Sequence, residues 1–259
     1  LELDVCSSDL EILPRQDSEL CAELKKQLQK QGIEFYTESR VMEIKEKDGM
    51  LLTIFEIKNG TKTINSEKVL MATGRTPVID AFKDICLDVD KTGLVVDEYL
   101  KTNLDNIYAV GDVTGKSMLA HVASHQGIIA VKNILGEKQK IDYKAIPSCI
   151  YTSPEMASVG LTEQEARRIF KDNIKVGRFS YAASGKAMTI GERIGFVKII
   201  AEPKYNEILG VHIVGPNATE LIAEAVLAVK LECTAEEVAY TIHAHPTLSE
   251  AVMEAAFDL

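Results

Sequence analysis

The sequence predicts a mixed α/β and α+β fold arranged in two domains. Its 259 residues correspond to about two domains at roughly 150 residues each. Hydrophobic residues make up 46% and charged residues 26%, which is ordinary for globular proteins and excludes wholesale disorder. Amphipathic helical stretches alternate with short β-rich runs, and a new β-rich segment begins near residue 146. We therefore expect a domain border close to that residue.

The first part of the chain is expected to combine one helix with a β-meander. Asp17 and Ser18 precede an apolar stripe over residues 20–31 that stops at Gly32, which is typical of a surface helix. Short β-rich runs follow at residues 34–36, 39–44 and 51–57. Turn signals separate them at residues 48–49 and 59–60. This pattern predicts a meander that closes on a strand over residues 68–72.

The remaining elements are expected in two groups. A short buried strand at residues 106–112 leads into a helix over residues 118–135. Beyond residue 146, strands are predicted at residues 174–180, 195–201 and 208–214. Three helices then follow, each opened by a capping-box pair. These pairs are Asn217 with Glu220, Thr234 with Glu237, and Thr247 with Glu250.

Charge and cysteine usage exclude several classes of partner. The 29 Lys and Arg against 39 Asp and Glu leave a net charge of −10, so we expect no nucleic-acid or anionic-membrane partner. No apolar run approaches the roughly 18 residues of a membrane span, and no signal segment opens the chain. The five cysteines are odd in number and widely spaced, which favours reduced thiols. We expect a cytoplasmic protein that binds small molecules or another copy of itself.

The densest group of polar residues lies near the carboxyl end of the chain. His243, His245 and Glu250 fall within eight residues that also contain a proline. A carboxylate can fix the tautomer of a neighbouring imidazole and stabilise its charged form, so His245 and Glu250 are candidates for general acid–base work. Alternatively, Glu250 only completes a capping box with Thr247 and the histidines are surface residues. A metal site at the two histidines lacks a third nearby ligand.

Two further positions could contact a ligand. Asp112 follows a predicted buried strand, and a carboxylate at the carboxyl edge of a sheet can accept hydrogen bonds from ligand hydroxyls. Gly and Asp are also common turn residues, so an ordinary turn is the alternative. Gly74 could allow close approach of a cofactor, or it could be a loop residue with a solvated Arg75 beside it.

Four segments carry a family resemblance: residues 72–77, 107–112, 147–155 and 243–250. With them, residues 11–259 resemble the C-terminal half of the dihydrolipoamide dehydrogenases, within the flavin-dependent pyridine nucleotide-disulfide oxidoreductases. The string His-Ala-His-Pro-Thr-Leu-Ser-Glu at residues 243–250 favours these enzymes over glutathione and mercuric reductases. The resemblance implies three parts: the end of a Rossmann-like NAD-binding domain (residues 11–78), a central FAD-contacting domain (79–145) and a complete α+β interface, or dimerisation, domain (146–259).

The same resemblance assigns roles to individual residues. His245 matches the acid–base group that takes a proton from the dithiol substrate, and Glu250 matches the residue that orients it. The interface domain implies a twofold homodimer in which His245 faces the flavin of the other subunit. Asp112 matches the aspartate that binds the ribityl chain of FAD. The other cofactor positions are Met118, Leu119, Ala120 and His121 along the flavin, Gly74 at NAD, and Val41 on the adenine side.

Three features of the family are absent from this sequence. It contains neither of the two Gly-x-Gly-x-x-Gly loops for FAD and NAD, nor the Cys-x4-Cys pair that accepts electrons from the dithiol. The family oxidises dihydrolipoamide through an enzyme disulfide and FAD to reduce NAD⁺. Its substrate is carried on a lipoyl domain of a 2-oxo acid dehydrogenase or glycine-cleavage complex. We therefore expect these 259 residues to have no dehydrogenase activity alone.

Residues 1–10 depart from the family pattern, and residues 5–10 resemble a translated sequencing adapter. We expect residues 1–10 to be a non-native, poorly packed segment joined to a fragment. Two other hypotheses stay open. The chain could be a stand-alone dimerisation or binding module without a redox role, or part of a related disulfide reductase with a different substrate.

Overall fold

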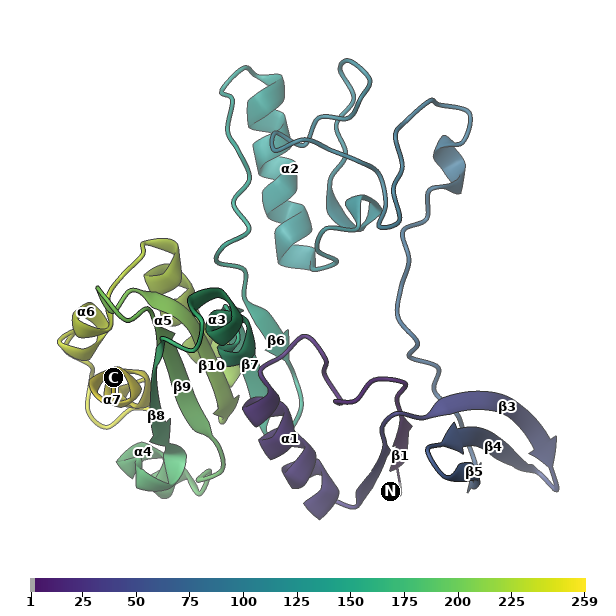
Figure 1. Cartoon of the computed structure of the whole chain (residues 1–259), viewed down its shortest axis with the longest axis horizontal. Helices are drawn as coiled ribbons and strands as arrows, with labels where there is room; N and C mark the ends of the chain where they lie inside the picture. Colours follow the sequence, from purple (N-terminus) through teal and green to yellow (C-terminus); the bar gives the residue numbers. More distant parts are fainter. Residues whose placement is uncertain (1–2) are drawn as a thin grey trace. The chain divides into compact units, whose positions relative to one another are not determined.

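The computed structural model describes residues 3–259 (Figure 1). The chain divides into two compact units, Leu70–Tyr143 and the combination of Leu1–Val69 with Lys144–Leu259. In the described part of the chain, no helix combines the length and hydrophobicity that a membrane crossing requires.

A five-stranded antiparallel sheet forms the centre of the larger unit (green in Figure 1). Its strand order is β6-β7-β10-β9-β8, so strands adjacent in the chain are mostly adjacent in the sheet. The three strands that the sequence predicts here are confirmed as β8, β9 and β10. The strand bounds are β6 Ser148–Ile150, β7 Glu155–Gly160, β8 Lys175–Ser180, β9 Phe196–Ala201 and β10 Ile208–Gly215.

Helices cover one face of this sheet. Alternate residues of β9 and β10, among them Val197, Ile199 and Ile213, are buried in one core with α5 and α7, as the two-residue period of a strand requires. Small residues on the helices allow close packing. The helices of this part are α3 Glu163–Phe170, α4 Gly185–Ile190, α5 Ala218–Lys230, α6 Ala235–Ala239 and α7 Glu250–Phe257, with a 3-10 turn η3 at Tyr181–Ala183.

Helix α1 (Ser18–Lys30) packs against the opposite face of the same sheet. Leu20 and Leu24 form a buried cluster with Met156 of β7 and Val214 of β10. The predicted helix is confirmed, although it begins two residues earlier, at Ser18. Asp17 is its N-cap, and its carboxylate accepts a hydrogen bond from the Glu19 amide at 3.1 Å.

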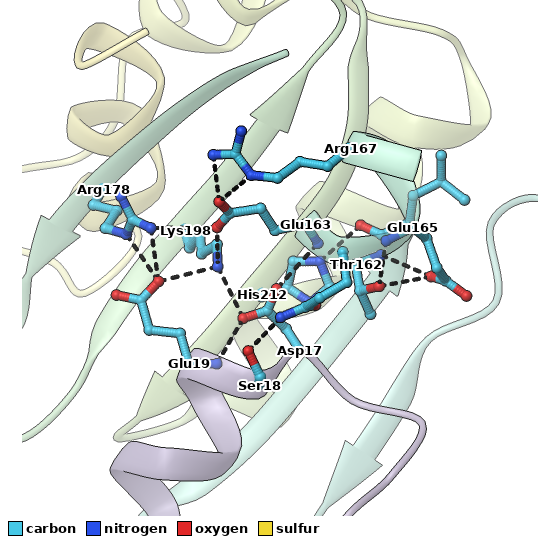
Figure 2. Close-up of polar contacts among 12 residues, drawn as sticks. Asp17, Ser18, Glu19, Thr162, Glu163, Glu165, Arg167, Arg178, Lys198 and His212 are labelled. Carbon is cyan, nitrogen blue, oxygen red and sulfur yellow. Dashed lines mark hydrogen bonds and ion pairs between the residues drawn. The ribbon is translucent and has the colours of Figure 1, made fainter. Parts of the chain in front are cut away.

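A row of polar residues, buried at Asp17 and Lys198, joins α1 to the sheet (Figure 2). Lys198 of β9, with 1% of its side chain exposed, donates to Asp17 at 2.9 Å and lies 2.6 Å from Glu163. Arg178 of β8 bonds Glu19 at 2.7 Å. Burial is the largest single influence on Asp17 and favours its neutral form, but the hydrogen bond from Lys198, the charge of Lys198 and the hydrogen bond from the Glu163 amide act with other charges to outweigh it. The pKa of Asp17 therefore lies below its usual value. Three carboxylates and two cations thus link elements far apart in the sequence.

The predicted β-meander is confirmed as a separate three-stranded sheet. Its order is β3-β4-β5, with bounds Arg40–Lys47, Met50–Ile57 and Gly60–Ser66. The turn between β3 and β4 places Asp48 and Gly49 at positive φ, as the Asp-Gly pair predicts. The strand expected at residues 68–72 is wrong: this stretch has no regular structure, and Leu70 is 89% exposed. Among the described residues no strand pairs with it, and an unpaired extended segment is not stabilised.

The expected poor packing of residues 1–10 is wrong for residues 3–7, whereas residues 8–10 are exposed as expected, Leu10 to 68%. Strand β1 (Leu3–Cys6) pairs in parallel with β2 (Ile33–Tyr36). Beyond the strand, the Ser39 amide donates to Ser7 at 2.8 Å and the Glu38 amide donates to Asp9 at 2.9 Å. Residues 1 and 2 lie outside the described part of the chain.

The smaller unit contains few regular elements: the 3-10 turns η1 (Asp80–Phe82) and η2 (Gly111–Thr114) and the helix α2 (Ala120–Ile134). The helix expected at residues 118–135 is thereby confirmed. The buried strand expected at residues 106–112 is wrong. Only Tyr108 forms a bridge, to Lys101, and Val110 is 36% exposed. Gly111 turns the backbone at a φ of 77°, which ends any extended run.

The capping boxes are only partly as predicted. Thr234 and Glu237 form the expected box at the start of α6. Asn217 and Glu220 do not, because Asn217 lies in the left-handed region at a φ of 55° and makes no side-chain cap. The Glu155 carboxylate replaces it by accepting from the Thr219 amide at 3.0 Å.

Candidate active site

His245 and Glu250 form a hydrogen-bonded pair in the larger unit. Nδ1 of His245 lies 2.8 Å from Oε1 of Glu250. A carboxylate can only accept here, so Nδ1 carries the hydrogen, and in the neutral ring Nε2 keeps its lone pair. The imidazole is 79% exposed and Glu250 is 22% exposed. The pair therefore presents a proton acceptor outward from a largely buried carboxylate.

The second oxygen of Glu250 is held by the backbone. The Thr247 amide donates to Oε2 at 2.8 Å. This bond, together with the bond from His245, lowers the pKa of Glu250, so the carboxylate stays charged and able to orient the ring. The Thr247 hydroxyl donates to the Ala244 carbonyl and does not accept a hydrogen bond from the Glu250 amide, as a complete capping box would require. The capping box expected there is therefore half formed, and Glu250 serves both the backbone and His245.

His243 lies apart from this pair. Its side chain is only 5% exposed. Nδ1 lies 2.8 Å from the Thr241 carbonyl, and Nε2 lies 2.8 Å from Oε1 of Glu224 on α5. Across residues 3–259, no three His, Cys, Asp or Glu side chains are placed to hold a metal ion.

In the smaller unit, one arginine brings together the positions expected at the flavin. Nη1 of Arg75 donates to Oδ2 of Asp112 at 2.9 Å, and Nη2 donates to the Met118 carbonyl at 2.7 Å. Arg75 is not among the site residues predicted from the sequence. Its position next to Gly74 is the one sequence feature that could have indicated it. Arg75 is the sole described partner of the Asp112 carboxylate, which leaves Oδ1 to accept from a ligand hydroxyl.

Residues Met118, Leu119, Ala120 and His121 lead into the first turn of α2. The N-cap, Leu119, makes no side-chain hydrogen bond to the helix. Gln126 lies further along α2, and its fully buried side chain accepts a hydrogen bond from the Gly111 amide. The turn at Gly111 is thus fixed against the helix that carries His121.

The two positions expected at NAD are accessible. Gly74 adopts a φ of 99°, and a Cβ placed on it would meet no atom within 4 Å. The space is open, but the left-handed backbone favours glycine there. Val41, on β3 of the larger unit, is 42% exposed.

Comparisons with known proteins identify the family. Residues 7–127 match the family model described as pyridine nucleotide-disulphide oxidoreductase, and residues 146–256 match the dimerisation domain of that family. A dihydrolipoyl dehydrogenase of Bacillus subtilis is 46% identical over 95% of this chain and 52% of its own length. The mitochondrial dihydrolipoyl dehydrogenase of Pisum sativum is 39% identical over 98% of this chain and 52% of its own length.

A solved structure agrees with these matches. The crystal structure of LpdA from Mycobacterium tuberculosis superposes with a TM-score of 0.89 at 27% identity, covering 99% of this chain and 56% of that one. The chain spans about half the length of the curated relatives it matches. The proteins of this family use FAD and NAD. Because the two family models together cover most of its length, the chain belongs to the pyridine nucleotide-disulphide oxidoreductases.

Proposed function

We propose that this chain is the C-terminal half of a flavin-dependent dihydrolipoyl dehydrogenase, which oxidises dihydrolipoamide and reduces NAD⁺. The observation that carries the proposal is the His245–Glu250 pair, with a hydrogen on Nδ1 held by the carboxylate at 2.8 Å. A neutral imidazole with an exposed Nε2 is the group that a dithiol substrate needs as a general base. The identity to dihydrolipoyl dehydrogenases supports the choice of substrate.

The chemistry assigned to the chain itself is proton transfer. Nε2 of His245 accepts a proton from a substrate thiol, because the thiolate and not the thiol is the nucleophile in disulfide exchange. The resulting imidazolium is stabilised by Glu250, whose lowered pKa keeps it ionised. Reversal of the transfer returns the proton to a leaving thiolate. When bound, FAD and NAD supply the electron and hydride transfer that complete the oxidation.

We assign the cofactor contacts by position. The free oxygen of Asp112 binds the ribityl chain of FAD, and residues 118–121 lie along the flavin. Gly74 and Val41 contact NAD. The geometry that supports the flavin assignment is the Arg75 bridge, which holds Asp112 and the Met118 carbonyl together.

We also propose that the chain alone has no dehydrogenase activity. Its sequence has no Cys-x4-Cys pair to accept electrons from the dithiol and no Gly-x-Gly-x-x-Gly loop to cradle a pyrophosphate. In the whole enzyme the substrate is the dihydrolipoamide of a lipoyl domain in a 2-oxo acid dehydrogenase or glycine-cleavage complex. A cytoplasmic location is part of the proposal, because the five cysteines form no disulfide with one another, which suits a reducing compartment.

We propose that the larger unit forms a homodimer through exposed apolar residues near His245. Tyr240 is 77%, Ile242 97% and Phe257 52% exposed, and the rings of Tyr240 and Phe257 lie 5.5 Å apart. Exposed apolar clusters of this kind mark contact surfaces, and residues 146–256 match a dimerisation domain.

Light scattering tests the dimer. The wild-type chain, with a mass of 28.5 kDa, should elute at twice that mass. Ile242→Asp should yield the monomer, because two carboxylates would be buried across a twofold axis. Tyr205→Asp, at a residue that is 66% exposed and outside the cluster, is the matched control. A wild-type chain that elutes as a monomer contradicts the proposal.

The enzymatic function is tested by joining residues 11–259 to the missing amino-terminal half of the Bacillus subtilis relative. We expect this chimera to purify with FAD and to form NADH from dihydrolipoamide and NAD⁺. Retained FAD serves as the control for assembly. A chimera that holds FAD but forms no NADH from dihydrolipoamide would overturn the proposed substrate. The chain by itself should form no NADH in the same assay.

A further inference from the structure

The loop that carries His245, residues 241–249, is anchored at both ends. At its carboxyl end, Leu248 is 7% exposed and belongs to the main core. At its amino end, Ile242 is 97% exposed and contributes no packing within the chain. At this end the Thr241 hydroxyl donates to the Glu237 carbonyl of α6 at 2.6 Å. The contact with helix α5 is made by His243, whose side chain is 5% exposed and reaches Glu224. The only described side chain that bonds the His245 ring is Glu250, which directly follows the loop.

The hydrogen-bond partners of His243 determine where its hydrogens lie. The Thr241 carbonyl can only accept, so Nδ1 must donate to it across 2.8 Å. A second hydrogen must lie between Nε2 and Oε1 of Glu224, which are also 2.8 Å apart, because a lone pair facing a carboxylate would be repelled. The His243–Glu224 pair is therefore held by a charge-assisted hydrogen bond, which is stronger than a neutral one.

We propose that His243 is a positioning residue for the acid–base pair: by bonding Glu224, it fixes the loop so that the His245 ring meets Glu250 through Nδ1. This inference rests on the proposed role of His245. The hydrogen bond between His243 and Glu224 determines the orientation of the His245 ring, which is 79% exposed and has little packing of its own.

Nitrogen NMR of the whole chain, labelled with ¹⁵N-histidine, tests the proposal at neutral pH. The sequence has five histidines, so the spectrum can be assigned by substitution. In the wild type, we expect His243 to show two protonated nitrogens and His245 to show the Nδ1–H tautomer. A His243 ring with one protonated nitrogen in the wild type would overturn the proposed anchor without any variant.

Two substitutions of Glu224 distinguish the effect of its hydrogen bond to His243 from the effect of its negative charge. Glu224→Ala should remove the second hydrogen from His243 and shift His245 towards the tautomer mixture of a free imidazole. Glu224→Gln should restore the Nδ1–H tautomer of His245, because the amide can donate to Nε2 of a neutral His243. Glu220→Ala, at an exposed residue one turn earlier on α5, is the matched control and should leave both rings unchanged.

The outcomes distinguish this inference from the function it rests on. If His245 keeps the Nδ1–H tautomer in Glu224→Ala, His243 does not position it and the inference fails while the acid–base proposal stands. If His245 shows the Nε2–H tautomer in the wild-type chain, the proposed base itself fails. Folding of each variant is checked by its backbone amide spectrum.

Discussion

Replacing Lys198 with methionine should lower the free energy of unfolding of the larger unit by about 3–5 kcal/mol, the cost of leaving a buried charge without its partner. The Lys198 and Asp17 side chains are 1% and 0% exposed and lie 2.9 Å apart. Methionine fills similar space but cannot neutralise Asp17 or Glu163. Because Asp17 also caps α1, the helix should loosen from the sheet together with its neighbours.

Amide hydrogen exchange on β9 and α1 measures this change within the unit. Lys26→Met is the matched control, because Lys26 lies on α1 in an ion pair with Glu23 at 3.3 Å and is 61% exposed. Such surface pairs contribute about 0–1 kcal/mol. A loss no larger for Lys198→Met than for Lys26→Met would show that the row of polar residues does not stabilise the contact between α1 and the sheet.

Replacing His245 with glutamine in the FAD-containing chimera should reduce kcat/KM for dihydrolipoamide by about 10²–10⁴-fold, the usual contribution of a positioned general base. Glutamine keeps the size and can still bond Glu250, but it cannot accept and carry a proton at neutral pH. Glu250→Gln should cause a smaller loss, because the imidazole remains while the carboxylate that fixes its tautomer does not.

His125→Gln is the control for the chimera. His125 is an exposed residue of α2 to which no role is assigned, so its substitution should leave turnover unchanged. The FAD content of each variant, read from the flavin absorbance, separates loss of chemistry from loss of cofactor. Wild-type turnover by a His245→Gln chimera would remove this residue from the mechanism.

Elements with a complete local signal could be predicted from the sequence. Helix α1 has its cap at Asp17, its apolar stripe and its glycine stop within one segment, and the structure differs from the prediction by two residues. The box of Thr234 and Glu237 is likewise local, because both partners lie on one turn. The His245–Glu250 contact spans five residues, so the sequence could suggest it, and the resemblance turned that suggestion into a role.

Contacts between distant residues had no sequence signal. Lys198 and Asp17 are 181 positions apart, and neither β9 nor α1 shows locally that it will bury a charge. The Arg75 bridge to Asp112 spans 37 positions and depends on how the loops of the smaller unit fold back. In the same way, the pair of His243 and Glu224 requires α5 to pack behind the loop.

The two mistaken strands share one cause. Residues 68–72 and 106–112 are apolar and β-branched enough to favour extended structure, but a strand is stable only when a neighbour completes its ladder. In the described residues, the first has no partner and the second has a single bridge at Tyr108. Local propensity carries no information about that pairing.

The most direct test of the central claim is the absorbance of the flavin in the FAD-loaded chimera after dihydrolipoamide is added without NAD⁺. We expect dihydrolipoamide to reduce the flavin as fast as the chimera turns over, and His245→Gln to slow this step. Added NAD⁺ should then restore the oxidised spectrum. A chimera whose bound flavin stays oxidised with dihydrolipoamide, yet is reduced by NADH, would contradict the assignment of this chain to a dihydrolipoyl dehydrogenase.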